Sequence, residues 1–330
     1  MPDRRPHHQP SPPKQHLDAA AIAMMVVLCA VWGLNQVAIK VANDGISPVL
    51  QAGLRSIGAT LLVSGWCAWR GTRLLVRDGS LLPGLCIAGL FAGEFAVLYW
   101  GLVYTTASRA VVFLYMAPFV VAVGAHLFVP SERLRTPQVI GLLCAFAGIA
   151  FAFADALRLP SGHELAGDAL ELAAALLWGA TTVLVKASRL ARIDPSRTLL
   201  YQLAGSAVAL PIASWALGEH GITAPTPLVL GALAYQTVVV ATISYMAWFA
   251  LMTRYPASQL SAFSFLTPLF GLLAGGLLLG EPITGGLAAA MLCVAFGIYL
   301  VNRRPAAVRA PPPPDDRAAA ARRRQGIGAP

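Results

Sequence analysis

Two charged side chains lie well inside long apolar stretches of this 330-residue sequence. Arg55 lies several residues into the stretch 48–69, and Glu94 lies well inside the stretch 81–103. A charge in apolar surroundings is expensive to desolvate, so it marks a candidate functional group. Glu94 is suited to bind an amine or to exchange a proton, and the planar guanidinium of Arg55 is suited to bind a carboxylate. The structural alternatives are an ion pair between the two side chains and hydrogen bonds to backbone groups.

Aromatic side chains form the second group of candidate binding residues, because their amphipathic rings can line an apolar cavity. Trp32 and Trp178 carry most weight, since each precedes a glycine that lets another helix approach closely. Asn35 lies about one helical turn from Trp32 and adds a polar group. Most aromatic residues of apolar segments are core or interface residues, and this role is the alternative at every position. The other aromatic candidates are Tyr99, Tyr115 and Tyr245.

Two prolines lie in the middle of apolar stretches. Pro118 lies within 107–129, and Pro268 lies within 257–279. A proline inside a helix removes one backbone hydrogen bond and bends the helix. We therefore expect paired kinks that serve as a hinge or gate, with a tolerated kink of no functional role as the alternative.

The residue sets that enzymes use are not apparent in the sequence. The six histidines are scattered and lie mostly in the polar ends and connections, so no metal site is expected. No nucleotide-binding loop of the form G-x-x-x-x-G-K-[ST] occurs. The net charge of +9 comes from arginines between apolar runs and in the termini rather than from one basic face, which argues against nucleic acid as a partner. We expect neither catalysis nor a cofactor.

The elements that position these residues are transmembrane helices. Hydrophobic residues make up 57% of the chain and charged residues 12%, about half the charged fraction of a soluble globular protein. Apolar runs of about 20 residues, enough to cross ~30 Å of hydrocarbon as helix, recur along the chain without the alternation of barrel strands. The sequence predicts an all-α integral membrane protein of about ten helices, near 19–42, 48–69, 81–103, 107–129, 137–154, 167–188, 198–217, 227–251, 257–279 and 283–302.

The placement of lysine and arginine predicts how these helices are oriented. With the N-terminus inside, basic residues concentrate in the cytoplasmic connections, and the outer side holds only Lys40, Arg109 and Arg158. Both termini are therefore expected in the cytoplasm, and the protein in a bacterial-type inner (plasma) membrane. Residues 1–18 and 303–330 are rich in proline and are expected to be disordered tails, the second of them near anionic membrane lipid.

The two halves of the apolar region resemble each other. Trp32 and Lys40 recur as Trp178 and Lys186 at one offset, since 178 − 32 and 186 − 40 both equal 146. A series of matches in the same order indicates duplication. Further matches, at offsets of 146 to 150, are Trp69 with Trp215, Ala107-Ser108 with Ala257-Ser258, Pro118 with Pro268, Glu132 with Glu281, and Gly148 with Gly297.

The duplication predicts two five-helix repeats, 19–154 and 167–302, joined by a periplasmic loop at 155–166. Because five is an odd number, the second repeat must enter the membrane from the opposite side and is inverted relative to the first. Inverted repeats are typical of alternating-access transporters, whose substrate site lies near the membrane midplane where the repeats meet.

On these motifs the chain resembles the EamA-type branch of the drug/metabolite transporter superfamily over about residues 19–302. The resemblance implies ten helices in a five-plus-five arrangement and a role similar to that of exporters of amino acids and other small metabolites. Relatives in the superfamily carry nucleotide sugars or cationic drugs. The residues that carry the likeness are Trp32-Gly33, Asn35, Lys40, Arg55, Ala107-Ser108, Pro118 and Gly280-Glu281-Pro282.

We expect a secondary transporter that exports amino acids or similar small metabolites across the inner membrane. One acid, one base and several aromatic rings suit a small zwitterion. Nucleotide sugars or lipophilic cationic drugs are the alternative substrates, although a phosphate would need more basic groups within the spans than Arg55 alone. Protons are a further expected partner, exchanged through Glu94. The alternatives from other classes are a membrane channel and an integral-membrane enzyme.

Overall fold

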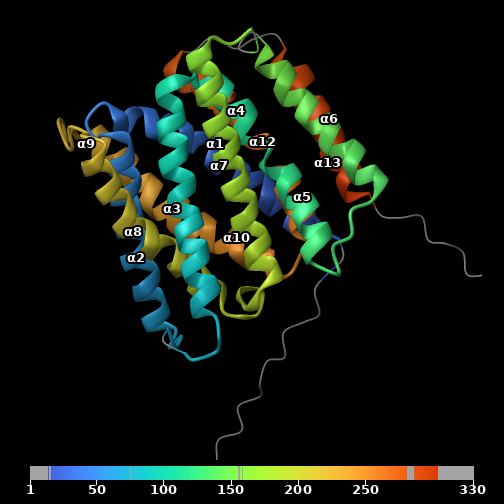
Figure 1. Cartoon of the computed structure of the whole chain (residues 1–330), viewed down its shortest axis with the longest axis horizontal. Helices are drawn as coiled ribbons and strands as arrows, with labels where there is room; N and C mark the ends of the chain where they lie inside the picture. The colour runs from blue at the N-terminus through green and yellow to red at the C-terminus, as the bar shows by residue number, and fades with distance from the viewer. Residues whose placement is uncertain are drawn as a thin grey trace, which may run out of the picture.

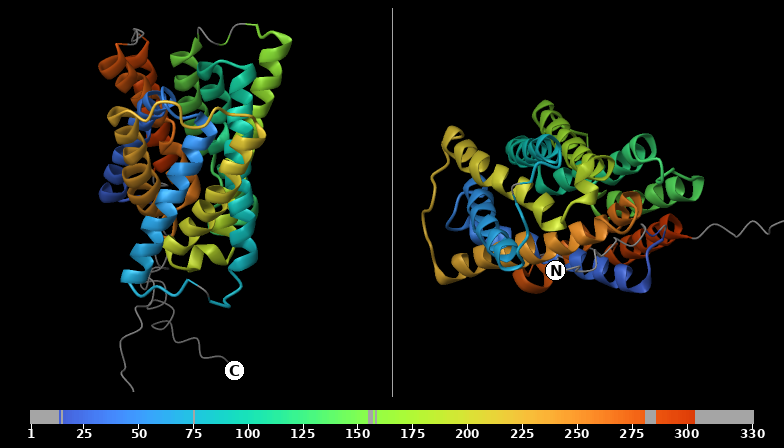
Figure 2. Two further views of the ribbon diagram at one scale, coloured as in Figure 1. Left: turned by 90° about the vertical axis from the view of Figure 1, so that its left-hand side faces the viewer. Right: turned by 90° about the horizontal axis from the view of Figure 1, so that it is seen from below.

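The structure, a computed structural model, describes residues 14, 16–74, 76–154, 157, 159–280 and 286–303. These residues form a bundle of helices without a β-sheet (Figures 1 and 2). The elements are α1 (Ala19–Asn43), α2 (Pro48–Trp69), α3 (Leu81–Tyr104), α4 (Ala107–Leu114), α5 (Ala117–Phe128), α6 (Thr136–Ala152), α7 (Gly162–Ala187), η2 (Arg189–Arg192), α8 (Pro195–Ala216), α9 (Pro227–Tyr235), η3 (Gln236–Ser244), α10 (Tyr245–Met252), α11 (Ala257–Phe263), α12 (Leu266–Leu279) and α13 (Leu287–Asn302).

Length and hydropathy suit these helices to a membrane. In the described part of the chain, seven helical segments are long and apolar enough to cross one, and α6 and α13 are shorter apolar helices. The 22-residue helix α2 is less apolar because it carries Gln51 and Arg55. When α4–α5, α9–η3–α10 and α11–α12 are each counted as one interrupted helix, the predicted all-α fold with about ten helices is confirmed.

Helices α7 and α8 begin earlier than expected from sequence, and α13 begins later, at Leu287 rather than at residue 283. Helix α7 begins at Gly162 rather than at residue 167, because Ser161 and Glu164 form a reciprocal cap. The Ser161 hydroxyl accepts the Glu164 N–H at 3.2 Å, and the Glu164 carboxylate accepts the Ser161 N–H at 2.9 Å. Helix α8 begins at Pro195 rather than at residue 198, since proline is well suited to the first helical turn.

Three of the membrane helices are interrupted. The break between α4 and α5 lies just before Pro118, and the break between α11 and α12 lies just before Pro268. Proline lacks the N–H that a continuous helix needs but fits at a helix start, so each interruption is a break rather than a bend. The third interruption is η3, a π-helical segment between α9 and α10. Segments of this kind often occur at functional sites.

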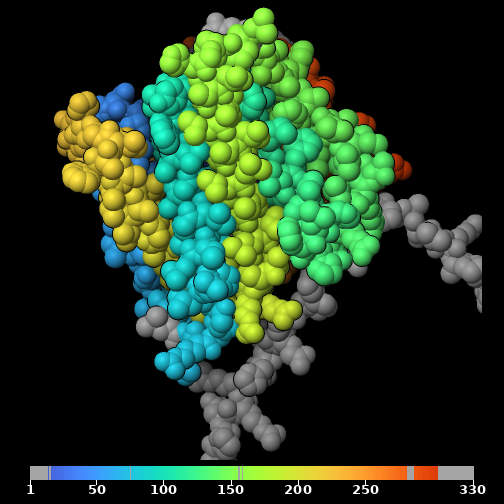
Figure 3. All heavy atoms as spheres, viewed as in Figure 1, coloured from blue at the N-terminus to red at the C-terminus, as the bar shows by residue number. Residues whose placement is uncertain are grey.

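The contacts between the two halves follow a pseudo-two-fold pattern. Helix α3 packs against α7 and α8, and its counterpart α9–η3–α10 packs against α1 and α2. Likewise α5 packs against α7 as α12 packs against α1, while α2–α8 and α6–α13 pair equivalent helices. Figure 1 shows α3 beside α7 and α6 beside α13, and Figure 3 shows the side chains of α3 and α7 meeting along one face. The arrangement confirms two inverted five-helix repeats.

Glycines permit close approaches between helices of the two halves, at equivalent places. A Cβ atom on Gly33 of α1 would lie 2.5 Å from the Cβ of Phe270 in α12. A Cβ atom on Gly179 of α7 would lie 2.5 Å from the Cβ of Val120 in α5. Only glycine allows helices to pack this closely. These equivalent contacts therefore hold in place the helical turn just before Gly33 in α1 and the turn just before Gly179 in α7.

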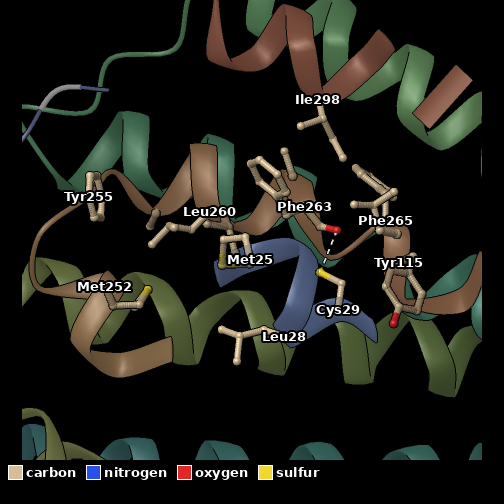
Figure 4. Packing of buried hydrophobic residues seen from close by; sticks show 14 of the residues in the cluster. Met25, Leu28, Cys29, Tyr115, Met252, Tyr255, Leu260, Phe263, Phe265 and Ile298 are labelled. Atoms are coloured by element: carbon tan, nitrogen blue, oxygen red, sulfur yellow. Dashed lines mark hydrogen bonds between the residues drawn. The ribbon is translucent and has the colours of Figure 1, made fainter. Parts of the chain in front are cut away.

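Much of the interior between the repeats is apolar, and so is much of the outer surface. Met25 and Cys29 of α1 are fully buried, and the Cys29 thiol donates to the carbonyl of Phe263 at 3.2 Å (Figure 4). Large exposed side chains such as Leu61 and Trp215 cover the outside of the bundle. A surface of this kind suits lipid rather than water.

Several predictions concern residues outside the described part of the chain. The two tails fall there at residues 1–13, 15 and 304–330, and the Glu281-Pro282 motif falls there within 281–285. Residues 155, 156 and 158 of the expected periplasmic loop lie there as well. In the described part of the N-terminal segment, the Lys14 N–H donates to the Arg254 carbonyl at 2.8 Å.

Candidate functional site

A cavity of about 240 Å³ lies between the two repeats. Helices α1, α2 and α3 bound it from one half, and α7, α8 and α10 bound it from the other. Its wall is mainly apolar with a few polar groups, a composition typical of small-molecule sites. The residues expected from sequence that line it are Trp32, Asn35, Arg55, Glu94, Tyr115, Trp178 and Tyr245.

Arg55 and Glu94 supply the charges of the cavity wall, and both are buried. The Arg55 guanidinium carbon lies 4.9 Å from the centroid of the Phe95 ring, a cation–π contact. Among the described residues, Arg55 Nε and Glu94 Oε2 have no hydrogen-bond partner, and no ion pair joins the two side chains. The cavity thus offers an acidic and a basic side chain that are not paired with each other.

The Oδ1 atom of Asn35 is a third buried polar atom without a hydrogen-bond partner in the described residues. Asn35 lines the same cavity from α1. Unpaired buried polar atoms are unusual in folded proteins and call for a partner that the protein itself does not supply. With the Thr267 hydroxyl, four such atoms lie around one cavity and indicate a site for a polar ligand.

Aromatic rings form one cluster on each side of the cavity. The Trp32 ring lies 5.7 Å from Trp248, edge to face, and its Nε1 donates to the Ser244 hydroxyl at 2.8 Å. The Trp178 ring lies 5.8 Å from Tyr115, nearly perpendicular to it. Because Trp32 and Trp178 occupy equivalent positions, the two repeats present similar aromatic walls.

Tyr99 is the expected binding residue that the fold does not bring into the cavity wall. It lies one turn beyond Phe95 on α3, and its ring stacks on Phe95 with the centroids 6.4 Å apart. It also packs against the small apolar cluster of Val49, Ala52 and Leu210. One helical turn is about 5.4 Å along the axis, enough to place Tyr99 past the end of the cavity.

The helix breaks lie at the level of the cavity. Leu114, the last residue of α4, and Ser264, which follows α11, both line it. Pro118 and Pro268 are buried one turn farther along each chain segment. Both prolines are therefore placed next to the candidate site rather than at a distance from it.

Sequence reasoning missed several polar lining residues, although the repeat offers a signal for them. Gln202 occupies in the second half the place that Arg55 has in the first, since 202 − 55 equals 147, the offset of Pro195 from Pro48. Thr181 corresponds to Asn35, since 181 − 35 equals 146, the offset of Trp178 from Trp32. The other unforeseen polar residues of the wall are Gln36, Thr182, Ser264 and Thr267.

The two repeats contribute different charges to the cavity wall. Its charged side chains come from α2 and α3 of the first repeat, whereas the second repeat contributes hydroxyl and amide groups. A ligand with a charged end and a neutral end would therefore bind in one orientation.

One end of the bundle is closed by a carboxylate at a helix N-terminus. The Glu219 carboxylate accepts the backbone N–H groups of Val49 and Leu50, each at 3.0 Å. Beside it, the Ser47 N–H donates to the Gly221 carbonyl at 2.9 Å. A negative charge is stabilised at a helix N-terminus, so these contacts join the first turn of α2 to the loop after α8. We call this the outer end, because α7 begins there and the basic residues predict it to face outward.

The opposite end is closed by ion pairs. Arg197 of α8 donates to the Asp78 carboxylate at 2.7 Å and to the Ser80 hydroxyl at 3.2 Å. The Arg197 guanidinium holds the pKa of the Asp78 carboxyl well below its usual range. The Arg189 side chain donates to the Asp78 carbonyl at 3.0 Å. The loop before α3 is thereby joined to the start of α8.

A second contact at this end joins three helices. The Lys186 ammonium lies 3.2 Å from the Glu132 carboxylate and donates to the carbonyls of Met252 and Tyr255 at 2.8 and 2.7 Å. The Glu132 carboxylate also accepts the Ala257 N–H at 2.7 Å, at the start of α11. Since α7 and α10 both contribute cavity residues, this contact stabilises the cavity wall from one end.

Inverted repeats around a central cavity with unpaired polar atoms define the class of polytopic membrane transporters. The model of the EamA-like transporter family matches residues 19–154 and 165–303. The chain therefore belongs to this family.

Several proteins are similar in sequence to nearly the whole transmembrane region of this chain. A Salmonella typhimurium protein named "Probable amino-acid metabolite efflux pump" is 32% identical, over 84% of this chain and 93% of its own length. An Escherichia coli protein of the same name is 29% identical over similar shares, 84% and 93%. An uncharacterized transporter of Bacillus subtilis is 28% identical over 88% and 93%. A crystal structure at 19% identity aligns with a TM-score of 0.73 over 86% of this chain and 96% of that chain, which supports the fold.

Proposed function

We propose that this protein is a secondary transporter that exports amino acids or similar small zwitterions across the inner membrane by alternating access. The observation that carries the proposal is the pair of unpaired charges in the cavity, Arg55 and Glu94. Glu94 would bind the substrate ammonium and Arg55 its carboxylate, since charge-assisted hydrogen bonds are the stronger kind.

The rest of the cavity would hold the substrate side chain. With the charged groups on the first repeat, the side chain of a bound amino acid would extend toward Trp178, Thr181 and Gln202 of the second. Trp32 and Tyr115 complete the aromatic wall. The volume of about 240 Å³ lies below the ~300–1,000 Å³ typical of pockets for drug-sized ligands. It therefore favours a small metabolite over a nucleotide sugar or a large lipophilic cation.

Two relatives support the substrate class, because each is named an amino-acid metabolite efflux pump. The same proposal includes both termini in the cytoplasm, contact with membrane lipid and no catalytic activity. The breaks at Pro118 and Pro268 would act as hinges, since both adjoin the cavity.

Uptake of a radiolabelled amino-acid panel into proteoliposomes tests the proposal. The purified wild-type chain should show saturable transport of at least one amino acid, and Glu94→Gln should lose it. Tyr99→Phe is the matched control, because Tyr99 lies outside the cavity wall. Transport of nucleotide sugars or cationic drugs, with none of any amino acid, would overturn the assignment.

A further inference from the structure

A second buried carboxyl, Glu171 of α7, lies outside the cavity wall. Its side chain is 0% exposed, and neither carboxyl oxygen has a hydrogen-bond partner among the described residues. Oxygen Oε1 lies only 2.7 Å from the point where a Cβ on Gly101 of α3 would stand. Glu171 therefore lies within the packed interface between α3 and α7, the two helices that Figure 1 shows side by side.

The neighbouring acid on α7 is already neutralised. Asp168, one turn before Glu171, accepts hydrogen bonds from the guanidinium of Arg109 in α4, one of them from Nε at 3.1 Å. The Thr105 hydroxyl donates to it at 2.8 Å. Arg109 and Asp168 are each 3% exposed. The cluster thus holds two carboxyls and one guanidinium, and an ionised Glu171 would add an uncompensated buried charge.

The inverted repeat provides an internal comparison for this position. Glu171 corresponds to Met25 of α1, since 171 − 25 equals 146. Met25 is also 0% exposed, and it packs in the apolar core (Figure 4). A neutral glutamic acid is close to methionine in size and shape, whereas a buried carboxylate without a partner is strongly disfavoured. The complete burial at both equivalent positions, together with the absence of a hydrogen-bond partner for Glu171 among the described residues, indicates that Glu171 holds a proton in this conformation.

Among the described residues, the other titratable groups around α7 do not compensate a charge on Glu171. Glu94 of α3 lies about two turns away and lines the cavity, and Tyr104 of the same helix is 37% exposed. Helix α4 contributes Arg109, which is engaged by Asp168. Helix α5 and η2 pack farther along α7, and α11 carries no titratable side chain. On α7 itself, His163 and Glu164 lie in the first turn at the outer end.

We propose that Glu171 is a proton-binding site, separate from the substrate site, whose protonation is required for the outer half of the transporter to close. When water reaches the interface of α3 and α7, Glu171 loses its proton to water. It regains one from the outer solution before the interface can pack again. The inference rests on the proposed transport function and assigns different tasks to two acids, with Glu94 binding substrate and Glu171 binding the proton.

Infrared spectroscopy of the protein in lipid nanodiscs tests the site without transport. The wild type should show a protonated-carboxyl C=O band at neutral pH that shifts in D₂O. Glu171→Gln and Glu171→Met should both lose that band, whereas the band should persist in Glu94→Gln. A spectrum without a band that depends on Glu171 would overturn the proposal, even if the protein transports amino acids.

Substrate exchange across proteoliposomes tests the consequence for transport. Wild-type exchange should slow as the external pH rises, because an ionised Glu171 prevents closure. Glu171→Gln and Glu171→Met should exchange at a rate that external pH no longer changes. A pH profile shared by the wild type and both variants would contradict the coupling role. If no amino acid is exchanged at all, the proposed function fails while the infrared result still decides the proton site.

Discussion

At the level of single residues, the candidate site is defined by buried polar groups that lack a hydrogen-bond partner among the described residues. Arg55, Glu94 and Asn35 each leave an atom unsatisfied in the described residues, and all three line one cavity. Arg109, Lys186 and Arg197, by contrast, form ion pairs near the helix ends. The first group is therefore available to a ligand, and the second holds the fold together.

Glu94→Gln tests the role of the cavity acid. The amide keeps the shape of the side chain but cannot form a charge-assisted bond with an ammonium group. Such bonds contribute about 1.5–3 kcal/mol, so the substrate Kd should rise about tenfold to a hundredfold. Tryptophan fluorescence titration of the purified variant measures it, since Trp32 and Trp178 line the cavity. An unchanged Kd, with Tyr99→Phe as control, would remove Glu94 from the site.

The two charged cavity residues could be found from sequence because charge inside an apolar stretch is conspicuous. The same criterion, a charge inside an apolar stretch, did not identify Glu171, for a geometric reason. With α7 expected to begin at residue 167, Glu171 was only the fifth residue of the helix, near its end, where charge is ordinary. The cap at Ser161 starts the helix at Gly162, so that Glu171 is the tenth residue. Gln202 was not identified because a neutral amide does not stand out as a charge does within an apolar stretch. It becomes apparent only when the two repeats are aligned.

At the scale of elements, the fold follows from apolar length, prolines and glycines that recur in both halves. The ten helices could be predicted from the apolar runs, and their inverted order from the repeat. The helix breaks could be predicted only as kinks, because a sequence does not show whether a proline bends a helix or starts a new one. The π-helical segment η3 had no sequence signal, since neither proline nor glycine lies within Gln236–Ser244.

Gly33→Ala and Gly179→Ala test the close approach of helices. The added Cβ would lie 2.5 Å from a neighbouring Cβ in each case, and overpacking of this kind costs about 1–3 kcal/mol. Both variants should therefore melt at lower temperature in detergent. Gly65→Ala is the matched control, because nothing lies within 4 Å of its added Cβ, and it should be neutral or stabilising. Equal melting temperatures for all three would refute the packing argument.

Pro118→Ala and Pro268→Ala test the hinges. Alanine restores the missing N–H, so each break should close toward a continuous helix. We expect a lower maximal transport rate with substrate Kd unchanged, because the breaks would serve the movement rather than the binding. Proteoliposome uptake and fluorescence titration measure the two quantities separately. Wild-type transport rates in both variants would show that the breaks are tolerated features without a role.

At the scale of the whole molecule, the two ends of the bundle are held by different chemistry. Glu219 binds backbone N–H groups of α2 at the outer end, whereas Asp78 and Arg197 form an ion pair at the other. Alternating access requires that these contacts break one end at a time. The ion pair depends on the pH through the Asp78 carboxyl, whose pKa the Arg197 guanidinium lowers.

Asp78→Asn tests this dependence. The lowered pKa of Asp78 in the folded protein means that its ion pair stabilises the fold above the ordinary aspartate pKa of about 3.9 and is lost as pH falls toward the folded value. The variant should therefore melt below the wild type at neutral pH, and the two should converge under acid conditions. Thermal melts across pH measure it, with Asp44→Asn as the exposed control. A gap that persists in acid would contradict the assignment.

Counterflow tests most directly whether one cavity between inverted repeats serves both sides of the membrane in turn. Proteoliposomes loaded with unlabelled amino acid are diluted into a trace of the labelled compound. Alternating access predicts transient accumulation of label above its external concentration, lost in Glu94→Gln and kept in Tyr99→Phe. Label that only equilibrates, at a rate independent of the internal amino acid, would show a channel and contradict the account.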